Sequence, residues 1–230
     1  QDNRFRTYTT KDGLFSDLNW PVYEDRRGNL WVGAEGGRVH QLREGVVHRT
    51  YQVGTPKSFF RSISEDRSGA LWIGTESDGL YRLHDGSLTV YTTKQGLVGD
   101  AISVLYLDRQ GDLWIGTNGG LNRLRGGHFT AYTSQDGLSP ARVLSIHEDG
   151  EGTLWIGTMG GGLNRLRQGR FTAYTTKEGL PDDVVYAILE DDGGNLWMSS
   201  RKGLFQVSKK QIDEFDRKKV GALSPHCFGS

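Results

Sequence analysis

The sequence has only one cysteine, Cys227, which excludes a framework of internal disulfides. No Cys/His spacing resembles a zinc site, and the six histidines are scattered, with no pair at ligand spacing. We therefore expect neither a bound metal nor a cofactor, and we interpret the lone thiol as incidental.

An excess of charge of one sign and long apolar runs are also absent. The 28 basic and 28 acidic side chains cancel, so we expect no binding of nucleic acid or of an anionic membrane. No apolar run approaches the roughly 18 residues that a membrane helix needs, and no signal peptide opens the chain. This segment is not expected to contact a membrane by itself. Gln1 in place of Met suggests processing or excision from something longer.

Glycine, by contrast, is abundant: 33 residues against 5 prolines. This composition is typical of many short strands joined by tight turns. The phrase Leu-Trp-Ile-Gly-Thr recurs with small variations, and its tryptophans lie 41, 42, 41 and 42 residues apart. These tryptophans are Trp31, Trp72, Trp114, Trp155 and Trp197.

Each repeat is predicted to form four antiparallel strands. The first strand ends at an Asp six residues before the Trp, and a Gly three residues after that Asp suits a tight hairpin. The second strand is the Trp-containing phrase, whose consecutive apolar residues indicate burial on both faces. The Gly in this phrase makes room for a neighbouring backbone or ring. A third, alternating strand and a fourth strand such as Phe129-Thr130-Ala131-Tyr132-Thr133 complete the unit.

Four strands in a unit of about 40 residues, with doubly buried inner strands, predict an all-β fold of the β-propeller type. We expect five four-stranded antiparallel blades within a propeller domain of residues 1–216. The expected blades cover residues 17–52, 58–93, 100–134, 141–176 and 183–216.

The two ends of the chain are less regular. A strand at residues 4–10 resembles the last strand of a unit and is a candidate to pair as the outer strand of the last blade, closing the ring. The segment Gln211 to Phe215 is interpreted as a degenerate fourth strand of that blade, and residues 217–230 as an irregular tail. If the ring is not closed, the end blades would expose apolar faces and drive self-association.

Four sequence elements follow one another in the repeats: F-T-x-Y-T-x-x-D-G-L, an apolar strand ending in Glu-Asp, Gly-x-Leu-Trp-Ile-Gly-Thr and Gly-Gly-Leu-x-Arg. Together they resemble the two-component regulator propeller repeat. The resemblance covers Phe5 to Phe215. It implies a periplasmic or extracellular ligand-sensing region of a signalling protein. In that family the ectodomain often has about fourteen repeats, so this chain resembles an excerpt or a short relative.

Acidic pairs such as Glu24/Asp25 and Glu148/Asp149 raise the alternative of a glycan-cleaving enzyme, which uses two carboxylates. They recur at the same hairpin in four of the five repeats, whereas a catalytic pair would occur once. We interpret them as turn residues and do not expect an enzyme.

Ligand binding is expected where the repeats differ, because shared positions maintain the blade. The position five residues before each turn Asp varies completely, and the connection Val53 to Phe60 departs from the repeated phrase. Aromatic and charged side chains there suit a small polar ligand such as a saccharide. The candidate ligand-binding residues are Trp20, Phe60, Arg61, Tyr186, Glu35, Glu76, Asp78 and Arg201.

Two rival interpretations stay open. Trp20 and Tyr186 could simply fill the channel of the propeller, which is at least as ordinary a role for aromatic side chains. The whole propeller could also serve as a scaffold for protein interaction or oligomerisation without holding a small molecule.

Overall fold

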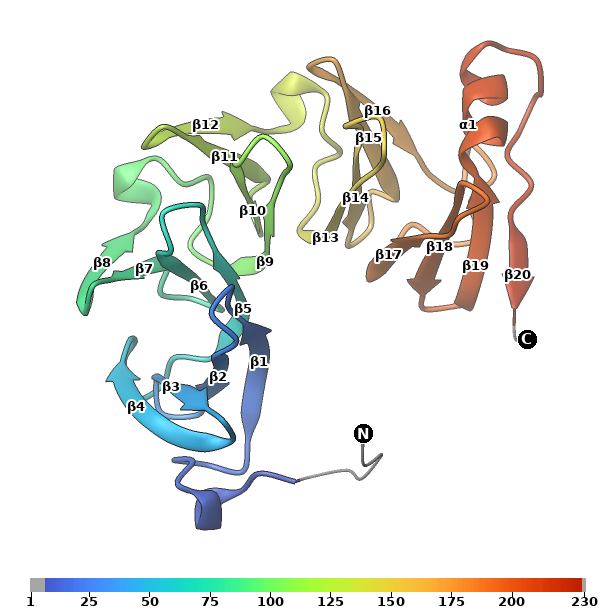
Figure 1. The fold of residues 1–230 in the computed structure, drawn as a ribbon. Helices are drawn as coiled ribbons and strands as arrows, with labels where there is room; N and C mark the ends of the chain where they lie inside the picture. The colour runs from blue at the N-terminus through green and yellow to red at the C-terminus, as the bar shows by residue number, and fades with distance from the viewer. Residues whose placement is uncertain (1–6, 229–230) are drawn as a thin grey trace. The chain divides into compact units, whose positions relative to one another are not determined.

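The computed structural model describes residues 7–228 and divides into two compact units. The first unit comprises Gln1–Gln95 and Asp100–Leu105, and the second comprises Gly96–Gly99 and Tyr106–Ser230. Five four-stranded sheets follow one another along the chain, and in each of them neighbouring strands pair in sequence order (Figure 1).

The first unit holds two complete sheets. The first sheet contains β1 (Asn19–Glu24), β2 (Leu30–Ala34), β3 (Arg38–Arg43) and β4 (Val46–Gln52). The second contains β5 (Phe60–Glu65), β6 (Leu71–Thr75), β7 (Leu80–His84) and β8 (Ser87–Tyr91). The pairings in both sheets are antiparallel throughout.

The other three sheets belong largely to the second unit. The third contains β9 (Ile102–Leu107), β10 (Leu113–Thr117), β11 (Leu121–Arg125) and β12 (His128–Tyr132). The fourth contains β13 (Val143–Glu148), β14 (Leu154–Thr158), β15 (Leu163–Arg167) and β16 (Arg170–Tyr174). The fifth contains β17 (Ala187–Glu190), β18 (Asn195–Ser200), β19 (Gly203–Ser208) and β20 (His226–Phe228). The strands of the first four sheets fall within the blade ranges expected from the repeats.

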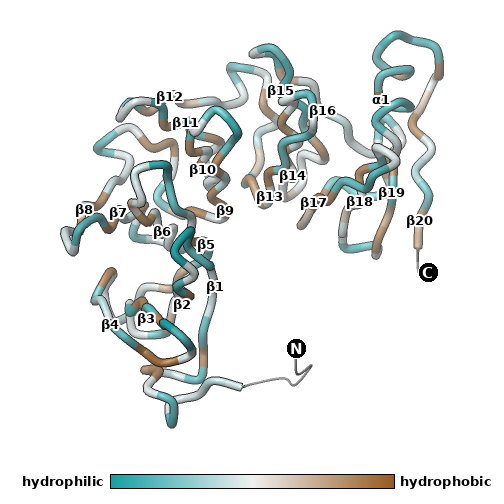
Figure 2. The backbone as a smooth tube through the Cα atoms, in the orientation of Figure 1, coloured by the Kyte–Doolittle hydropathy of each residue, from teal (hydrophilic) through white to brown (hydrophobic). Residues whose placement is uncertain are grey.

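The second strand of each sheet carries the core. All five residues of β6, of β10 and of β14 are buried, as the consecutive apolar residues of these strands predict. Figure 2 colours the chain by hydropathy, and hydrophobic stretches lie along the inner strands. The motif glycine is required for this packing. A Cβ atom on Gly33 would lie 2.4 Å from the carbonyl oxygen of Trp20, so only glycine lets β1 approach β2 this closely.

The turn Asp of each repeat holds both its own hairpin and the following tryptophan. In the first sheet, Oδ1 of Asp25 accepts hydrogen bonds from the backbone N–H groups of Arg27 and Asn29, while Oδ2 accepts one from Nε1 of Trp31. The same indole-to-carboxylate bond recurs in every sheet. Its lengths are 2.8 Å for Trp31–Asp25, 2.8 Å for Trp72–Asp66, 2.8 Å for Trp114–Asp108, 3.0 Å for Trp155–Asp149 and 2.7 Å for Trp197–Asp191.

The prediction of a strand at Gln211 to Phe215 is wrong, because Lys209–Asp216 forms a helix, α1. Ser208 caps this helix by accepting a hydrogen bond of 3.1 Å from the N–H of Gln211. Ile212 is fully buried, and Phe215, three residues later on the same helical face, packs against the same core cluster. Lys, Gln and Glu make up half of this helix and are good helix formers, and its apolar side chains stand at helical spacing. Both features outweigh the weak strand pattern.

The fourth strand of the last sheet is instead β20, which lies in the segment expected to be an irregular tail. It pairs with β19 through Leu204 and Phe228. The Phe228 ring stacks on Trp197 at 4.9 Å, much as Tyr51 lies against Trp31 at 5.8 Å in the first sheet. β20 therefore supplies the aromatic residue that the outer strand supplies elsewhere.

The prediction of an outer strand at residues 4–10 is also wrong for residues 7–10, which the structure describes. Residues 4–6 lie outside the described residues, residues 7–9 are not in a strand, and Thr10–Asp12 forms a short 3-10 helix, η1. Thr9 and Asp12 form a capping box there, which explains the turn conformation. The place beside β19 is occupied by β20 and not by this segment.

Candidate functional site

A pocket of about 280 Å³ lies in the first unit, where β1 packs against β5. Its lining residues are Trp20, Phe59, Phe60, Arg61 and Glu76. Four of them belong to the candidate ligand-binding residues from the sequence. The volume of about 280 Å³ lies just below the range of roughly 300–1,000 Å³ that is usual for small-molecule sites, so the pocket fits a compact ligand.

Repeat geometry brings Trp20 and Arg61 together. Both occupy the position five residues before the turn Asp, one on β1 and the other on β5, so they stand at the same level of adjacent first strands. Glu76 follows β6 directly, where its backbone N–H donates a 2.9 Å hydrogen bond to the carbonyl of Phe59. The turn after β6 is thereby fixed beside the start of β5.

The pocket has an aromatic side. The Trp20 side chain is 54% exposed and Phe59 is 43% exposed, whereas Phe60 is 2% exposed and belongs to the core between the first two sheets. Large aromatic surfaces left open beside a pocket cost free energy in water and are the surfaces that ligands cover. Phe60 is thus a fixed floor residue, and Trp20 and Phe59 are the accessible rings.

The pocket also has a charged side. Nη2 of Arg61 lies 2.8 Å from Oε1 of Glu76, and the two side chains are 49% and 42% exposed. Ion pairs this exposed contribute only about 0–1 kcal/mol because water screens them. A ligand can therefore replace one partner of the pair at little cost. The ligand would accept hydrogen bonds from the guanidinium of Arg61 and donate them to the carboxylate of Glu76.

The four remaining candidates do not line this pocket. The Glu35 side chain accepts a hydrogen bond of 3.3 Å from Ser16. Asp78 accepts hydrogen bonds from Ser58 and Ser77, which tie it to the connection before β5 and to its own turn. Both therefore hold loop structure in the first unit.

Tyr186 and Arg201 lie in the second unit. Tyr186 precedes β17 and is 46% exposed. Arg201 pairs with the buried carboxylate of Asp182 at 2.7 Å. Hydrogen bonding from Arg201 outweighs the opposing effect of burial and holds the pKa of Asp182 below its ordinary value. Arg201 therefore ties the turn after β18 to the connection before β17.

Sequence reasoning did not single out Phe59. It lies within the irregular connection Val53 to Phe60, but only its neighbour was chosen from that segment. A signal was available, because adjacent residues entering a strand point to opposite sides, so two consecutive aromatics place one ring in the core and the other outside.

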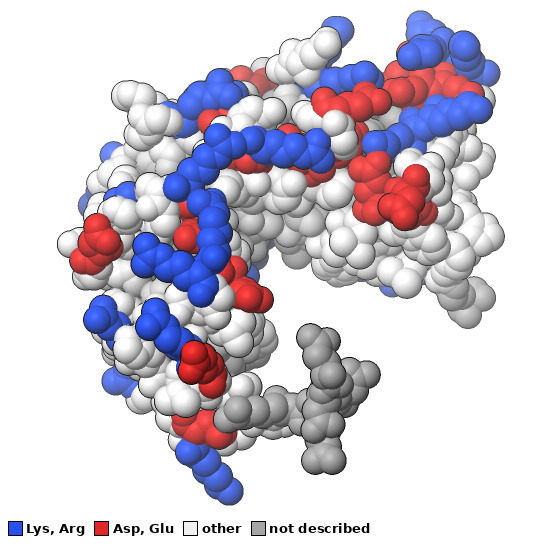
Figure 3. All heavy atoms as spheres, viewed as in Figure 1, with Lys and Arg blue, Asp and Glu red and all other residues white. Residues whose placement is uncertain are grey.

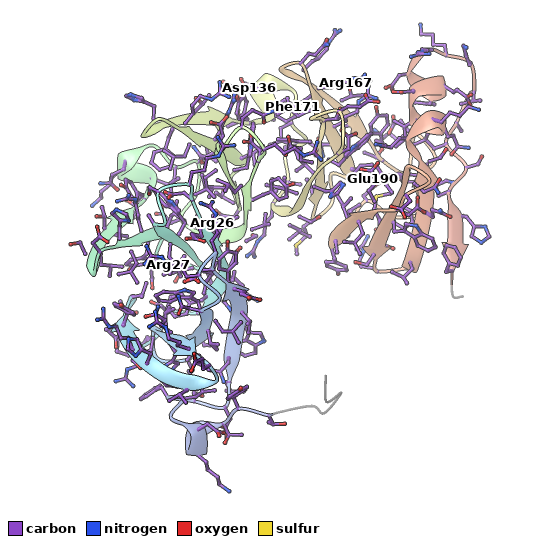
Figure 4. All side chains as sticks on the ribbon, viewed as in Figure 1. Arg26, Arg27, Asp136, Arg167, Phe171 and Glu190 are labelled. Carbon is purple, nitrogen blue, oxygen red and sulfur yellow. The ribbon has the colours of Figure 1, made fainter. Side chains whose placement is uncertain are left out.

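The recurring acidic pairs make contacts between successive sheets. Glu65 accepts a hydrogen bond of 2.9 Å from the backbone N–H of Arg26, and Glu148 accepts one of 2.9 Å from that of Arg109. Glu190, labelled in Figure 4, lies on β17 and pairs with Lys209 and, at 3.2 Å, with His147. These carboxylates bind the turn or strand of the preceding repeat.

Among residues 7–228, no three His, Cys, Asp or Glu side chains cluster in a way that could hold a metal ion. None of the helices in that range is long and apolar enough to cross a membrane. On the face of each unit drawn in Figure 3, basic and acidic side chains are interspersed.

Five sheets of four antiparallel strands, each built on the same Asp–Trp anchor, define a protein of the β-propeller class. The family named Two component regulator propeller matches four segments, at residues 54–77, 96–119, 137–160 and 179–202. The chain thus carries the repeats of the two-component regulator propeller family, and this confirms the resemblance found in the sequence.

Solved structures agree on the fold. The extracellular domain of the hybrid two component system BT3049 from B. thetaiotaomicron aligns with a TM-score of 0.70 and 24% identity, covering 84% of this chain and 28% of that one. Virginiamycin B lyase from Staphylococcus aureus aligns with a TM-score of 0.70 and 16% identity, covering 92% and 70%. The gluconolactonase XC5397 from Xanthomonas campestris aligns with a TM-score of 0.57 and 15% identity, covering 91% and 75%.

At these identities the similarity shows the fold alone. The chain spans little more than a quarter of the BT3049 domain, at 28%. A search among curated proteins finds no match. The chain therefore carries two-component regulator propeller repeats, and it shares its fold with an extracellular domain of a two component system as well as with a lyase and a gluconolactonase. Its own role has to be argued from its own residues.

Proposed function

We propose that this chain is a ligand-binding propeller from the extracytoplasmic sensing region of a signalling protein. The observation that carries the proposal is the pocket between β1 and β5, which is lined by two exposed aromatic rings and an exposed Arg–Glu pair. The repeats of the two-component regulator propeller family support the sensing role, and the likeness to an extracellular domain supports a periplasmic or extracellular location.

The chemistry of the pocket fits a small saccharide. The apolar C–H face of a sugar ring stacks on an aromatic ring, for which Trp20 and Phe59 are available. Sugar hydroxyl groups both donate and accept hydrogen bonds, so they match Arg61 as the donor and Glu76 as the acceptor. The exposed ion pair keeps both groups oriented until the ligand arrives.

The same pocket favours binding over hydrolysis. A glycosidase needs two carboxylates flanking one bond, roughly 5–9.5 Å apart. Among the five residues that line this pocket, Glu76 is the carboxylate, and it is held by Arg61. We therefore propose a non-enzymatic role. Cleavage of any glycan in a polysaccharide panel would overturn this part of the proposal.

Calorimetric titration with saccharides selected from a thermal-shift library tests the proposal. Trp20→Ala and Arg61→Ala should each weaken binding at least tenfold, while the circular dichroism spectrum stays unchanged. Tyr186→Ala is the matched control, because Tyr186 occupies the corresponding position of another repeat and does not line the pocket. Full binding by both pocket variants would refute the site.

A further inference from the structure

The pocket lined by Trp20, Phe59, Phe60, Arg61 and Glu76 offers a cation more favourable partners than an anion. The face of an aromatic ring carries partial negative charge, so it attracts a cation and repels an anion. Three of the five lining residues are aromatic, one is acidic and one is basic. The rings therefore decide between the two charges, because Arg61 and Glu76 offset each other.

The acidic residue is held beside one of the accessible rings. The backbone N–H of Glu76 donates a hydrogen bond of 2.9 Å to the carbonyl oxygen of Phe59. The segments that carry the carboxylate and the Phe59 ring are thereby tied to each other at the pocket. A positive charge that binds to Glu76 consequently lies close to an exposed aromatic side chain.

Close packing brings the second accessible ring to the same place. A Cβ atom on Gly33 would lie 2.4 Å from the carbonyl oxygen of Trp20 and 3.1 Å from the Cβ atom of Phe60. The backbone of Trp20 is therefore held near Phe60, the neighbour of Phe59 in the chain. Tryptophan is the side chain with the strongest attraction for a cation, and Trp20 is exposed at the pocket.

Arg61 is the replaceable partner of Glu76. The pair spans 2.8 Å, but both side chains are exposed, so water screens the attraction between them. A ligand ammonium group can take the place of the guanidinium on Glu76 with little loss. Arg61 has five N–H donors in total, and these remain available for hydroxyl groups of the same ligand.

We propose that the pocket selects an amino sugar, whose protonated amine binds Glu76 and the aromatic rings while its hydroxyl groups accept hydrogen bonds from Arg61. This inference rests on the proposed saccharide pocket and adds the charge of the ligand to it. A hydrogen bond between an ammonium group and a carboxylate is roughly twice as strong as a neutral one, so the amine and not a hydroxyl group takes Glu76. A sugar carboxylate would meet repulsion from Glu76 and from the ring faces.

Calorimetric titration of the unmodified chain with four monosaccharides tests the selection. At about pH 7, where an amine of this kind is largely protonated, glucosamine should bind about tenfold more tightly than glucose or N-acetylglucosamine, which have the same ring without the charge. Glucuronate should bind most weakly. Raising the pH to about 9 deprotonates the amine and should remove the preference for glucosamine, while the affinity for glucose stays the same.

Glu76→Gln assigns the preference to one side chain. This variant keeps the size of the side chain and removes its charge, so the ratio of glucosamine affinity to glucose affinity should fall from about ten to about one. Glu35→Gln is the matched control. Glu35 follows β2 as Glu76 follows β6, and its backbone N–H likewise bonds to the carbonyl of the residue before β1, Leu18, but it does not line the pocket. The ratio should be unchanged in Glu35→Gln.

The outcomes separate this inference from the proposed function. Equal affinity for glucosamine and glucose at pH 7 would overturn the inference and leave the saccharide pocket standing, and so would tighter binding of glucuronate than of glucosamine. A preference for glucosamine that survives in Glu76→Gln would also overturn it, because the amine would then bind elsewhere. If none of the four sugars bound, the proposed function would fail and the inference with it.

Discussion

The indole Nε1 of Trp114 donates a hydrogen bond of 2.8 Å to Oδ2 of Asp108, and both side chains are buried. The other carboxylate oxygen accepts the backbone N–H of Asp112 at 2.8 Å. One Asp thus fixes the turn between two strands and the depth of the tryptophan in the core. The six-residue interval between Asp and Trp is kept in all five repeats because it sets this contact.

Asp108→Ala should lower the free energy of unfolding by about 1–3 kcal/mol, because two buried donors lose their acceptor. Urea denaturation followed by tryptophan fluorescence measures the change. Asp192→Ala is the control, since Asp192 is exposed in the corresponding turn of the last sheet and should change stability by less than about 0.5 kcal/mol. Equal effects of both substitutions would refute the anchor role.

Acid should destabilise the fold through the turn carboxylates of Asp66 and Asp191. Hydrogen bonds from Trp197 and Asn195 lower the pKa of Asp191 to about 2. Burial alone would raise the pKa of Asp66, but hydrogen bonds from Ser68 and Trp72 outweigh it, and the pKa is lowered. A lowered pKa means that the stabilisation is present above the unfolded-state value of 3.8 and is lost as the pH falls towards 2.

These carboxylates are best observed in a His40→Asn chain, which lacks the separate effect of the His40 imidazole on acid stability. In that chain the melting temperature should be nearly constant just above pH 4 and should fall progressively from pH 4 to pH 2. Differential scanning calorimetry checks this. A melting temperature that does not change between pH 4 and pH 2 would contradict the assigned role of the turn carboxylates.

His40 should add a second acid-sensitive step at higher pH. Burial and the charge of Arg38 lower the pKa of His40 from its ordinary value of 6.5. Its Nε2 accepts a hydrogen bond of 3.0 Å from the N–H of Phe15, so Nδ1 carries the proton and donates to Thr50 at 2.8 Å. Protonation removes that acceptor, so the stabilisation is present above pH 6.5 and is lost as the pH falls through the folded-state pKa.

His40→Asn is the informative variant, because Asn122 and Asn164 occupy the corresponding position in other sheets and accept the corresponding backbone hydrogen bond. Their Oδ1 atoms each accept a backbone N–H at 2.9 Å, from Val98 and from Ser139. The variant should fold and should lose the step in melting temperature between pH 7 and pH 5, within the range of ordinary histidine titration. An unchanged step would place its origin elsewhere.

Arg165 should hold α1 against the fourth sheet. Its guanidinium pairs with Asp213 at 2.9 Å and with Asp216, which also accepts a hydrogen bond of 2.9 Å from the Tyr174 hydroxyl. Arg165→Ala should cost about 1–3 kcal/mol and make α1 sensitive to limited proteolysis, because Arg165 is largely buried.

The matched control for Arg165 is Arg167→Ala. Arg167, labelled in Figure 4, is 44% exposed; it pairs with Glu151 at 3.0 Å and, at the longer distance of 3.7 Å, with Asp213 of α1. The loss of ion pairs this exposed should cost less than about 1 kcal/mol. If Arg167→Ala released α1 as readily as Arg165→Ala, the anchoring would not depend on Arg165.

The regular interval of Asp, Gly and Trp was sufficient to predict five four-stranded sheets, because every hairpin is encoded locally. It was not sufficient for α1 and β20. The helical pattern of α1 rests on Ile212 and Phe215 within eight residues. β20 has three residues and becomes a strand through pairing with the edge of β19, which a local pattern does not contain.

The pocket was partly predictable for the same reason. Trp20 and Arg61 share a position in adjacent repeats, so the sequence places them at one level, and in the structure both line one pocket. The contacts of Glu35 and Asp78 depend on how their loops fold back onto Ser16 and Ser58. The spacing of the repeats does not predict these loop conformations.

The most direct test of the proposed function is a nitrogen–proton NMR spectrum of the tryptophan indole groups during titration with a saccharide. Five of the six tryptophans are bonded to their turn Asp, and Trp20 is outside that set. We expect the Trp20 indole signal to shift saturably while the other five stay in place. Saturable binding that leaves the Trp20 signal unmoved would contradict the proposed site.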